Sequence, residues 1–367
     1  MSDAFTLFGK ATEISSGLFY TPVHTAATAA HEQVVYFEDE KTGLQAIIAI
    51  HDTTFGPSLG GTRMWPYPNL EAALDDVLRL SKGMTYKAAI SGLNQGGGKA
   101  VIIGDSRTDK SEELFRAFGR CVDFLSGQYI TAEDVGMDEE NMAWVHQETP
   151  HVTGLPKHLG GSGDPSPFTA LGVYVSMKAS MQYATGQDSL EGKKIAIQGA
   201  GHVASYLAKH LQKEGAILYI SDIYPEKAEQ LAAELGAEIL APEHILSHRV
   251  DILSPCALGG VINDDTLDHL ACDFIVGGAN NILREEVHGQ RLKEKSILYA
   301  PDYVVNAGGI INISNEIGGY NPERAAEQTR EIYDTLLEVF DYAEKHNLTP
   351  NLASNQLVEQ RLANAQK

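Results

Sequence analysis

Two lysines and a run of three glycines form the stretch best suited to acid–base chemistry. Lys87 and Lys99 lie 12 residues apart, and Lys99 directly follows Gly96-Gly97-Gly98 and opens an apolar run typical of a buried strand. Glycines allow positive φ angles and the close approach of another group. Desolvation and a neighbouring cation both lower the pKa of an ammonium group, so a lysine in this position can act as a general base. The alternative is that both lysines are surface charges beside a flexible loop.

A second candidate site lies in the segment Gly199-Ala200-Gly201-His202-Val203-Ala204, between a predicted strand and a predicted helix. This G-x-G-x-x-A pattern binds the pyrophosphate of a dinucleotide at the helix N-terminus. The next strand ends at Asp222, 21 residues after Gly201, where a carboxylate would bind the ribose hydroxyls. Asp222 would repel a 2′-phosphate, and Lys227 is the only nearby cation, so the pattern favours NAD over NADP. The alternative is a glycine-rich turn without a ligand.

The elements that must position these residues fall into two groups. Hydrophobic patterning in the first 150 residues predicts a mixture of hairpin strands and helices, with strands at 34–37, 44–50, 100–103 and 128–131, and helices that begin at Asn69 and Ser111. The glycine-rich segment 56–64 is predicted to be a loop, and the first 30 residues to be weakly structured.

Beyond a Gly-, Pro- and Ser-rich segment at 154–167, strands and helices alternate. Strands are predicted at 194–198, 217–221, 251–254, 274–276 and 297–300, and helices at 166–184, 202–214, 225–235, 321–345 and 351–367. Such alternation predicts a doubly wound parallel sheet. We therefore predict an α/β protein with two domains. A mixed-sheet substrate, catalytic and oligomerisation domain spans 1–152 and 338–367, with C-terminal helices returning to it, and a Rossmann dinucleotide-binding domain spans 153–337.

Composition excludes several classes of partner. The net charge of −21 disfavours nucleic acid and anionic membranes. No apolar run approaches the length of a membrane span, and the N-terminus lacks the pattern of a secretory signal. The 3 cysteines have no metal-ligand spacing. We expect a cytoplasmic protein without a bound metal.

The chain resembles the Glu/Leu/Phe/Val dehydrogenase family, and most of all its leucine-specific members, over residues 31–365. The resemblance is carried by long motifs in the family's order: A-I-I-A-I-H-D-T-T at 46–54, G-G-T-R-M-W at 60–65, the lysine segment at 81–101, Y-I-T-A-E-D-V-G at 129–136, the glycine pattern at 199–204, D-I-L-S-P-C-A-L-G-G at 251–260 and Y-A-P-D-Y-V-V-N-A-G-G-I-I-N at 299–312. It implies reversible oxidative deamination of an L-amino acid to a 2-oxo acid and ammonia, with NAD as hydride acceptor, in a homo-oligomer.

The resemblance also implies roles for individual residues. Lys99 would be the general base that activates water, Asp134 would exchange protons with the substrate nitrogen, and Lys87 would bind the substrate α-carboxylate. Asn306 would orient both the substrate and the nicotinamide. The other implied substrate-binding residues are Leu59, Gly60, Met84 and Ala132, and the implied cofactor-binding residues are Gly199, Gly201, His202, Val203, Asp222, Ala257, Leu258, Thr169 and Asn306. Without the resemblance, Asp134 would be interpreted as the N-cap of a helix that follows it.

Part of the substrate preference can be inferred from the sequence. In glutamate-specific relatives a lysine precedes the Gly-Gly pair and binds the side-chain carboxylate, whereas this chain has Leu59, which would leave that carboxylate unpaired. Ala132-Glu133 differs from the Gly-Thr of phenylalanine-specific members and indicates a branched-chain substrate such as leucine, valine or isoleucine. Asn280-Asn281 resembles tryptophan-specific members, so phenylalanine or tryptophan remains an alternative. A catalytically silent dinucleotide-binding sensor is the alternative from a different functional class.

Overall fold

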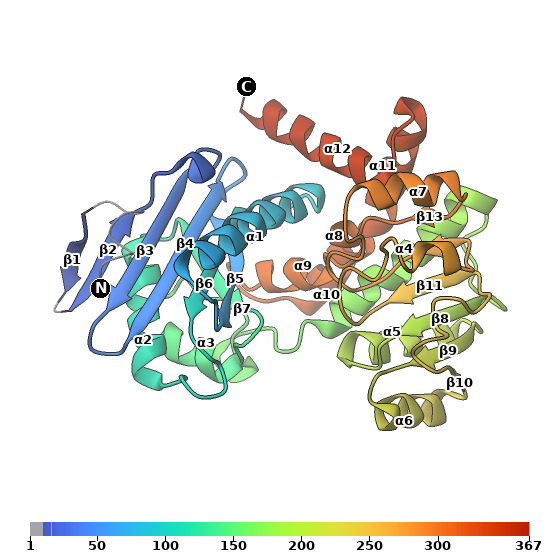
Figure 1. The fold of residues 1–367 in the computed structure, drawn as a ribbon, viewed down its shortest axis with the longest axis horizontal. Coiled ribbons are helices and arrows are strands. Elements are labelled where there is room, and N and C mark those ends of the chain that lie inside the picture. Colours follow the sequence, from blue (N-terminus) through green and yellow to red (C-terminus); the bar gives the residue numbers. More distant parts are fainter. Residues whose placement is uncertain (1–9, 16, 367) are drawn as a thin grey trace. The chain divides into compact units, whose positions relative to one another are not determined.

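The computed structural model describes residues 10–15 and 17–366 (Figure 1). The nine N-terminal residues, to which the expectation about a secretory signal applies, lie outside the described residues. The chain divides into two compact units. The first comprises residues 1–163, 313–321 and 361–367, and the second comprises 164–312 and 322–360. The domain limits expected from the sequence, 1–152 with 338–367 and 153–337, remain a prediction.

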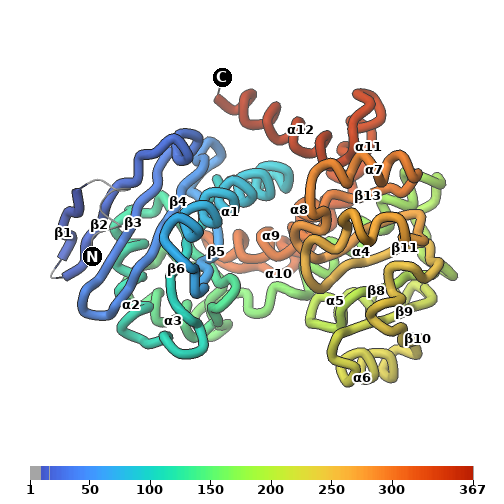
Figure 2. The backbone as a smooth tube through the Cα atoms, viewed as in Figure 1, coloured from blue at the N-terminus to red at the C-terminus, as the bar shows by residue number. Residues whose placement is uncertain are grey.

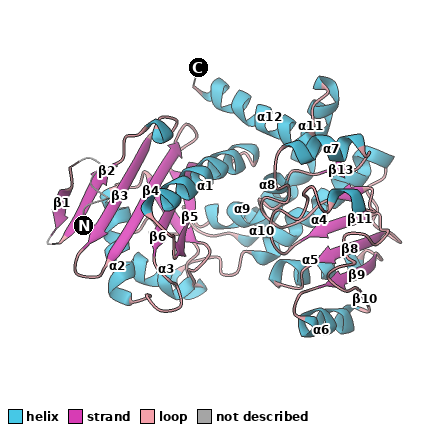
Figure 3. Ribbon diagram, in the orientation of Figure 1, coloured by secondary structure: helices cyan, strands magenta, loops and turns pink. Residues whose placement is uncertain are grey.

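A seven-stranded mixed sheet forms the centre of the first unit, with strand order β1-β2-β3-β4-β6-β5-β7 (Figure 3). The strands are β1 (Thr12–Ser15), β2 (Leu18–Pro22), β3 (Gln33–Asp39), β4 (Leu44–Asp52), β5 (Ser58–Trp65), β6 (Gly96–Ile103) and β7 (Tyr129–Glu133). β5 runs parallel to both of its neighbours, while β1 to β4 pair antiparallel. Because successive side chains of a strand point to opposite faces, the apolar residues of this sheet form two faces, and each must be covered by other elements.

Three helices cover those faces. α1 (Leu70–Ile90) packs on one face over a core that includes Val77, Ile47 and Val101. α2 (Glu112–Phe124) and α3 (Glu139–His146) pack on the other face (Figure 1). The side chain of Asn69 accepts a hydrogen bond from the backbone N–H of Ala72, as expected for an N-cap. α1 continues to Ile90, so the helix carries Lys87 on its last turns.

The second unit contains a parallel six-stranded sheet in the order β10-β9-β8-β11-β12-β13. The strands are β8 (Lys194–Gln198), β9 (Ile217–Ser221), β10 (Glu238–Ile239), β11 (Ile252–Pro255), β12 (Phe274–Ile275) and β13 (Leu298–Tyr299). In chain order this is 3-2-1-4-5-6, the order of a dinucleotide-binding doubly wound sheet. The strand order reverses between β8 and β11, and ligands bind at such a reversal.

Of the α-helices described after Gly163, one precedes this sheet, three connect its strands and five follow it, and Figure 2 follows the path of the chain through them. They are α4 (Ser166–Thr185), α5 (His202–Lys213), α6 (Pro225–Leu235), α7 (Val287–Glu294), α8 (Asp302–Val305), α9 (Gly308–Ser314), α10 (Pro322–Arg330), α11 (Ile332–His346) and α12 (Pro350–Ala365). α11 packs on α4. The C-terminal return to the first unit is made by residues from Arg361 onward, where Arg361 donates to the carbonyl oxygens of Ala89 and Ile90.

The predicted α/β fold with one mixed and one parallel sheet is confirmed. Two local predictions are wrong. The segment 56–64 is largely the strand β5 rather than a loop. The strands β1 and β2 pair antiparallel where the sequence predicts weak structure. Among the described residues, none of the helices is long and apolar enough to cross a membrane.

Candidate active site

Glycines allow three strands of the first unit to approach one another closely. β5 lies between β6 and β7, and Gly60 and Gly61 sit in its middle. A Cβ atom at Gly60 would lie 1.8 Å from the carbonyl oxygen of Gly98. A Cβ atom at Gly61 would lie 2.9 Å from the Cβ of Asp134. No side chain fits at either position, so the Gly-Gly pair is required to bring Asp134 beside β5.

The three glycines before Lys99 serve the same purpose. They are part of β6, and none of them has a positive φ. A Cβ atom at Gly97 would lie 2.0 Å from the backbone nitrogen of Thr85, so α1 packs directly against the strand at this point. The expectation of close approach is confirmed, and the alternative of a flexible glycine loop is wrong, because all three glycines lie in a strand.

Lys99 and Asp134 form the polar centre of this site. Lys99 is 6% exposed, so the alternative that it is a surface charge is wrong. Its Nζ lies 2.8 Å from Oδ2 of Asp134, which follows β7 directly. The helix N-cap alternative for Asp134 is also wrong, because the cap of α3 is Asp138, whose side chain accepts from the backbone N–H of Asn141.

The charge state of Asp134 follows from its neighbours. Burial opposes ionisation, but the positive charges of Lys99 and Arg63 outweigh it and lower the pKa of Asp134 to about 2. The Asp134 side chain is 24% exposed. At neutral pH the site therefore offers a carboxylate that a ligand can reach, held against a buried ammonium group.

The remaining predicted substrate residues come from three elements of the first unit. Leu59 in β5 and Ala132 in β7 are buried, at 0% and 2% exposure. Met84 in α1 lies near Gly60, since a Cβ there would be 3.3 Å from Cγ of Met84. Lys87, one turn further along α1, is half-buried. The alternation of β5, β6 and β7 places Leu59 on the same face as Lys99 and Asp134, the face that α1 covers.

Sequence reasoning missed the buried hydrogen bonds on the face of the sheet opposite Lys99. The hydroxyl of Tyr129 donates to the carbonyl oxygen of Gly60 at 2.7 Å. Thr62 and Thr131 share a buried hydrogen bond of 2.6 Å. Burial raises the pKa of Tyr129 far above its ordinary value, so it stays a neutral donor. The sequence signal for these hydrogen bonds was the alternation of polar and apolar residues along β7.

A pocket of about 500 Å³ in the second unit lies where the strand order reverses. Gly199, at the end of β8, has a φ of 106°, and a Cβ there would lie 3.1 Å from the carbonyl oxygen of Cys256, so the fold itself requires glycine. Gly201 differs. It has a φ of −80°, and a Cβ there would meet no atom within 4 Å. The space over Gly201 thus fits a ligand's pyrophosphate rather than a part of the chain.

Asp222 completes the loop at the end of β9. Its carboxylate accepts from the backbone N–H of Ala200 at 2.7 Å and from that of Tyr224 at 2.9 Å. Ala257 and Leu258 line the same pocket, and Leu258 is 80% exposed. A carboxylate for ribose hydroxyls, a free helix N-terminus and exposed apolar side chains are the groups that a dinucleotide requires, so the residues present fit this cofactor.

The other predicted cofactor residues lie around this sheet. Asn306 is 6% exposed, and its side-chain amide donates to Oδ1 of Asn280 at 2.8 Å. Thr169 in α4 is near Gly309, where a Cβ would lie 3.0 Å from its hydroxyl oxygen. Two further predicted residues begin α5: His202 is exposed, and Val203 packs toward Gly278.

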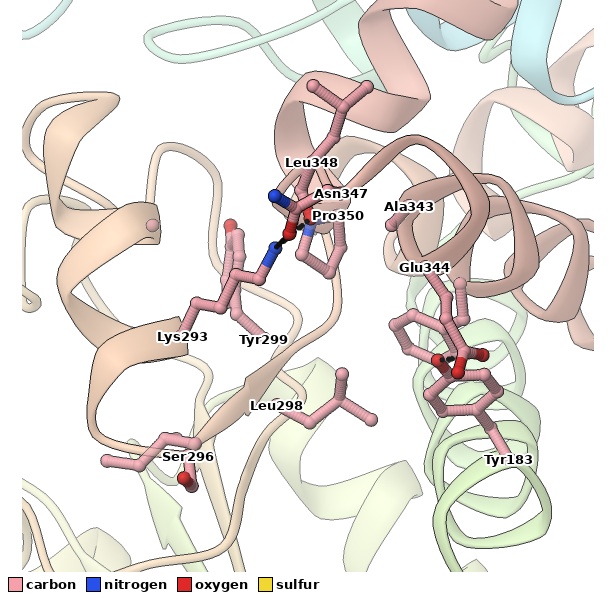
Figure 4. A pocket seen from close by; sticks show the side chains of 13 residues that line it. Tyr183, Lys293, Ser296, Leu298, Tyr299, Ala343, Glu344, Asn347, Leu348 and Pro350 are labelled. Atoms are coloured by element: carbon pink, nitrogen blue, oxygen red, sulfur yellow. Dashed lines mark hydrogen bonds between the residues drawn. The ribbon is translucent and has the colours of Figure 1, made fainter.

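Figure 4 shows a separate pocket of about 360 Å³ in the second unit, which contains none of the predicted site residues. Its polar groups pair with one another. Lys293 donates to the side chain of Asn347 and to the carbonyl oxygen of Leu348, and the Tyr183 hydroxyl donates to Glu344. The lysine therefore holds the segment that follows α11. The described residues also contain no cluster of three or more side chains able to hold a metal ion.

Comparisons with known proteins identify the family to which the chain belongs. Residues 31–151 match the family described as Glu/Leu/Phe/Val dehydrogenase, dimerisation domain, and residues 160–225 and 222–367 match Glutamate/Leucine/Phenylalanine/Valine dehydrogenase. A leucine dehydrogenase of Thermoactinomyces intermedius is 53% identical over 332 residues, 90% of this chain and 91% of the relative. A phenylalanine dehydrogenase of Lysinibacillus sphaericus is 48% identical over 343 residues, 92% and 90% of the two chains. The crystal structure of L-tryptophan dehydrogenase from Nostoc punctiforme has a TM-score of 0.83 and 44% identity, covering 92% of this chain and 97% of the other.

Proposed function

Since the chain belongs to the Glu/Leu/Phe/Val dehydrogenase family and is an NAD(P)-dependent amino acid dehydrogenase, we propose that it catalyses the reversible oxidative deamination of a branched-chain L-amino acid with NAD. The observation that carries this proposal is the buried ion pair between Lys99 and Asp134 on the face that also carries Leu59. The alternative of a catalytically silent sensor is set aside by the family assignment.

The two charged groups would divide the proton transfers. The substrate amine must be neutral before hydride leaves its carbon, and the Asp134 carboxylate, ionised at neutral pH, would accept the proton from the substrate ammonium group. The Asp134 side chain, which is 24% exposed, would pass this proton to solvent, and the carboxylate, ionised again, would stabilise the positive charge that develops on the imine. Lys99 would then take a proton from the water that attacks the imino carbon. Lys87 would bind the substrate α-carboxylate from α1.

The second unit would bind the cofactor through its glycine loop and Asp222. NAD, when bound, accepts the hydride from the substrate. Asp222 would accept hydrogen bonds from the ribose hydroxyls and would repel a 2′-phosphate, which supports NAD over NADP. The nearby cation Lys227 lies over the ring of Tyr224, with 5.0 Å between its Nζ and the ring centroid. Asn306 would orient the substrate and the nicotinamide end.

Apolar residues support an aliphatic substrate. Leu59 and Ala132 offer no partner for a side-chain carboxylate, so glutamate would lose its hydration without compensation. NADH formation with leucine, valine, isoleucine, phenylalanine, tryptophan and glutamate tests this proposal. We expect the highest kcat/KM among the three branched-chain substrates and the lowest for glutamate. A higher value for tryptophan or phenylalanine would instead support the second candidate, which Asn280-Asn281 favours.

We also propose that the protein is a homo-oligomer. The match to a dimerisation domain supports this, and β1 forms an outer edge of the seven-stranded sheet, where backbone groups are open to pairing. Light scattering after size-exclusion chromatography gives the mass in solution. A mass equal to one chain at enzymatic concentrations would contradict the proposal.

A further inference from the structure

Asp134 is in contact with a second cation, whose role is not evident from the sequence. Arg63 lies in β5, two residues after Gly61 and therefore on the same strand face. Its Nε lies 3.3 Å from Oδ2 of Asp134, the oxygen that also contacts Lys99. The Arg63 side chain is only 22% exposed. One carboxylate oxygen thus faces two positive charges that come from two neighbouring strands.

The far side of Arg63 is held in place. Its NH1 donates to Oδ2 of Asp76 in α1 at 2.9 Å. Asp76 also accepts from the hydroxyl of Tyr67 at 2.6 Å and from Arg79 at 2.7 Å. The guanidinium group therefore bridges two carboxylates, one on α1 and one after β7. A planar group with several N–H donors can do this, whereas an ammonium group cannot hold both in fixed directions.

We propose that Arg63 is a positioning residue for the reaction, which fixes the orientation of Asp134 and keeps it ionised while Lys99 gives up and regains its proton. This inference rests on the proposed function. An arginine stays charged throughout, whereas the lysine of the pair becomes neutral when it acts as a base. Without Arg63, the proton that Lys99 gives up could pass to Asp134, and the carboxylate would lose the charge with which it binds the substrate ammonium group.

Other groups near Asp134 do not supply this charge. Tyr129 is buried and neutral. The side chain of Glu133 lies toward Gly154, since a Cβ at Gly154 would be 3.7 Å from its Cγ. Arg79 contacts Asp76 and is 58% exposed. Arg63 and Lys99 are the two cations whose nitrogen atoms lie within ion-pair distance of Asp134 in the contacts described, at 3.3 Å and 2.8 Å.

The test compares Arg63→Gln with Arg79→Gln, which removes a cation from the same network without touching Asp134. In the dependence of kcat/KM on pH, we expect the acid limb of Arg63→Gln to move upward by about one pH unit or more, because a contacting arginine lowers a carboxyl pKa by that order. The acid limb of Arg79→Gln should stay in place. NADH affinity should be unchanged in both variants. Superimposable profiles for Arg63→Gln and the unaltered enzyme, or equal shifts in both variants, would overturn the proposal.

A second readout does not need turnover. In protein carrying ¹³C-labelled aspartate, Asp134→Asn identifies the carboxyl signal of Asp134, whose titration midpoint should rise in Arg63→Gln. If no amino acid is oxidised, the proposed function fails, yet this titration still decides whether Arg63 governs Asp134. If Arg63→Gln does not fold by circular dichroism, Arg63→Met, which also removes the charge, takes its place. A raised midpoint in that variant supports the proposal, and an unchanged midpoint overturns it.

Discussion

The two glycines of the dinucleotide loop should respond in opposite ways to a single methyl group. Gly199 has a φ of 106°, and its added Cβ would lie 3.1 Å from the carbonyl oxygen of Cys256 and 3.2 Å from the Cβ of Ala257. Both the backbone angle and the contacts are unfavourable, so Gly199→Ala should lower the free energy of unfolding by about 1–3 kcal/mol. Gly201 has an ordinary φ of −80° and open space around the new atom.

For Gly201→Ala we expect the free energy of unfolding to change by less than about 1 kcal/mol. Alanine restricts the unfolded chain, which stabilises the fold, but it is a poorer N-cap residue than glycine. The methyl group would occupy the space over the start of α5 where the pyrophosphate would lie. NADH affinity should therefore fall at least about tenfold, or roughly 1.4 kcal/mol of binding free energy.

Urea unfolding followed by circular dichroism measures the first quantity, and calorimetric titration with NADH measures the second. The decisive result is a separation of the two effects: Gly201→Ala stable but weak in NADH binding, and Gly199→Ala destabilised. If Gly201→Ala binds NADH as tightly as the unaltered protein, the open space does not hold the pyrophosphate, and the reasoning from the empty Cβ position fails.

Three further predictions address other parts of the molecule. Lys99→Ala should reduce kcat by about 10²–10⁴-fold, while calorimetry should find NADH binding unchanged, because the cofactor residues belong to the other unit. Asp222→Ala should weaken NAD binding and reduce the preference over NADP in paired titrations. Burial is the main reason, and the charge of His31 the second, why the pKa of His51 is lowered from 6.5 to about 4, so on acidification His51 is protonated in the unfolded chain before it is protonated in the folded one. The stability that depends on neutral His51 is therefore fully present above pH 6.5 and is lost as the pH falls toward 4, by an amount on the order of 1–3 kcal/mol. In His51→Gln, the free energy of unfolding measured in urea should depend less on pH across that window.

The second unit could be predicted from the sequence because its signals are local. The strand Ile217–Ser221 and the helix Pro225–Leu235 were predicted with the bounds that the structure has. The strands β8, β9 and β11 consist mostly of buried apolar residues, so hydrophobic patterning is sufficient to find them. The two-residue strand β10 was missed, since Glu238 and Ile239 are exposed and carry no such pattern.

The first unit was harder because its strand β5 looks like a loop. Gly60 and Gly61 usually indicate a turn. Here they are required because carbonyl groups and Asp134 approach the strand from both sides and leave no room for a side chain. This approach depends on pairing with β6 and β7, which lie 35 or more residues further along the chain. The role of Arg63 could not be predicted for the same reason. Only when β5 is known to be a strand does the alternation of side chains place Arg63 on the same face as Gly61, and so beside Asp134.

The partner of Lys99 changes how its reactivity should be explained. The sequence suggested a lysine activated as a base by a second lysine and by burial, but the charge in contact with its Nζ is the Asp134 carboxylate at 2.8 Å. In the proposed reaction the ammonium group of the substrate would compete with Lys99 for this carboxylate. Substrate binding would thus weaken the ion pair of Lys99 at the stage when the attacking water needs a base, whereas in the free protein the ion pair would keep Lys99 occupied.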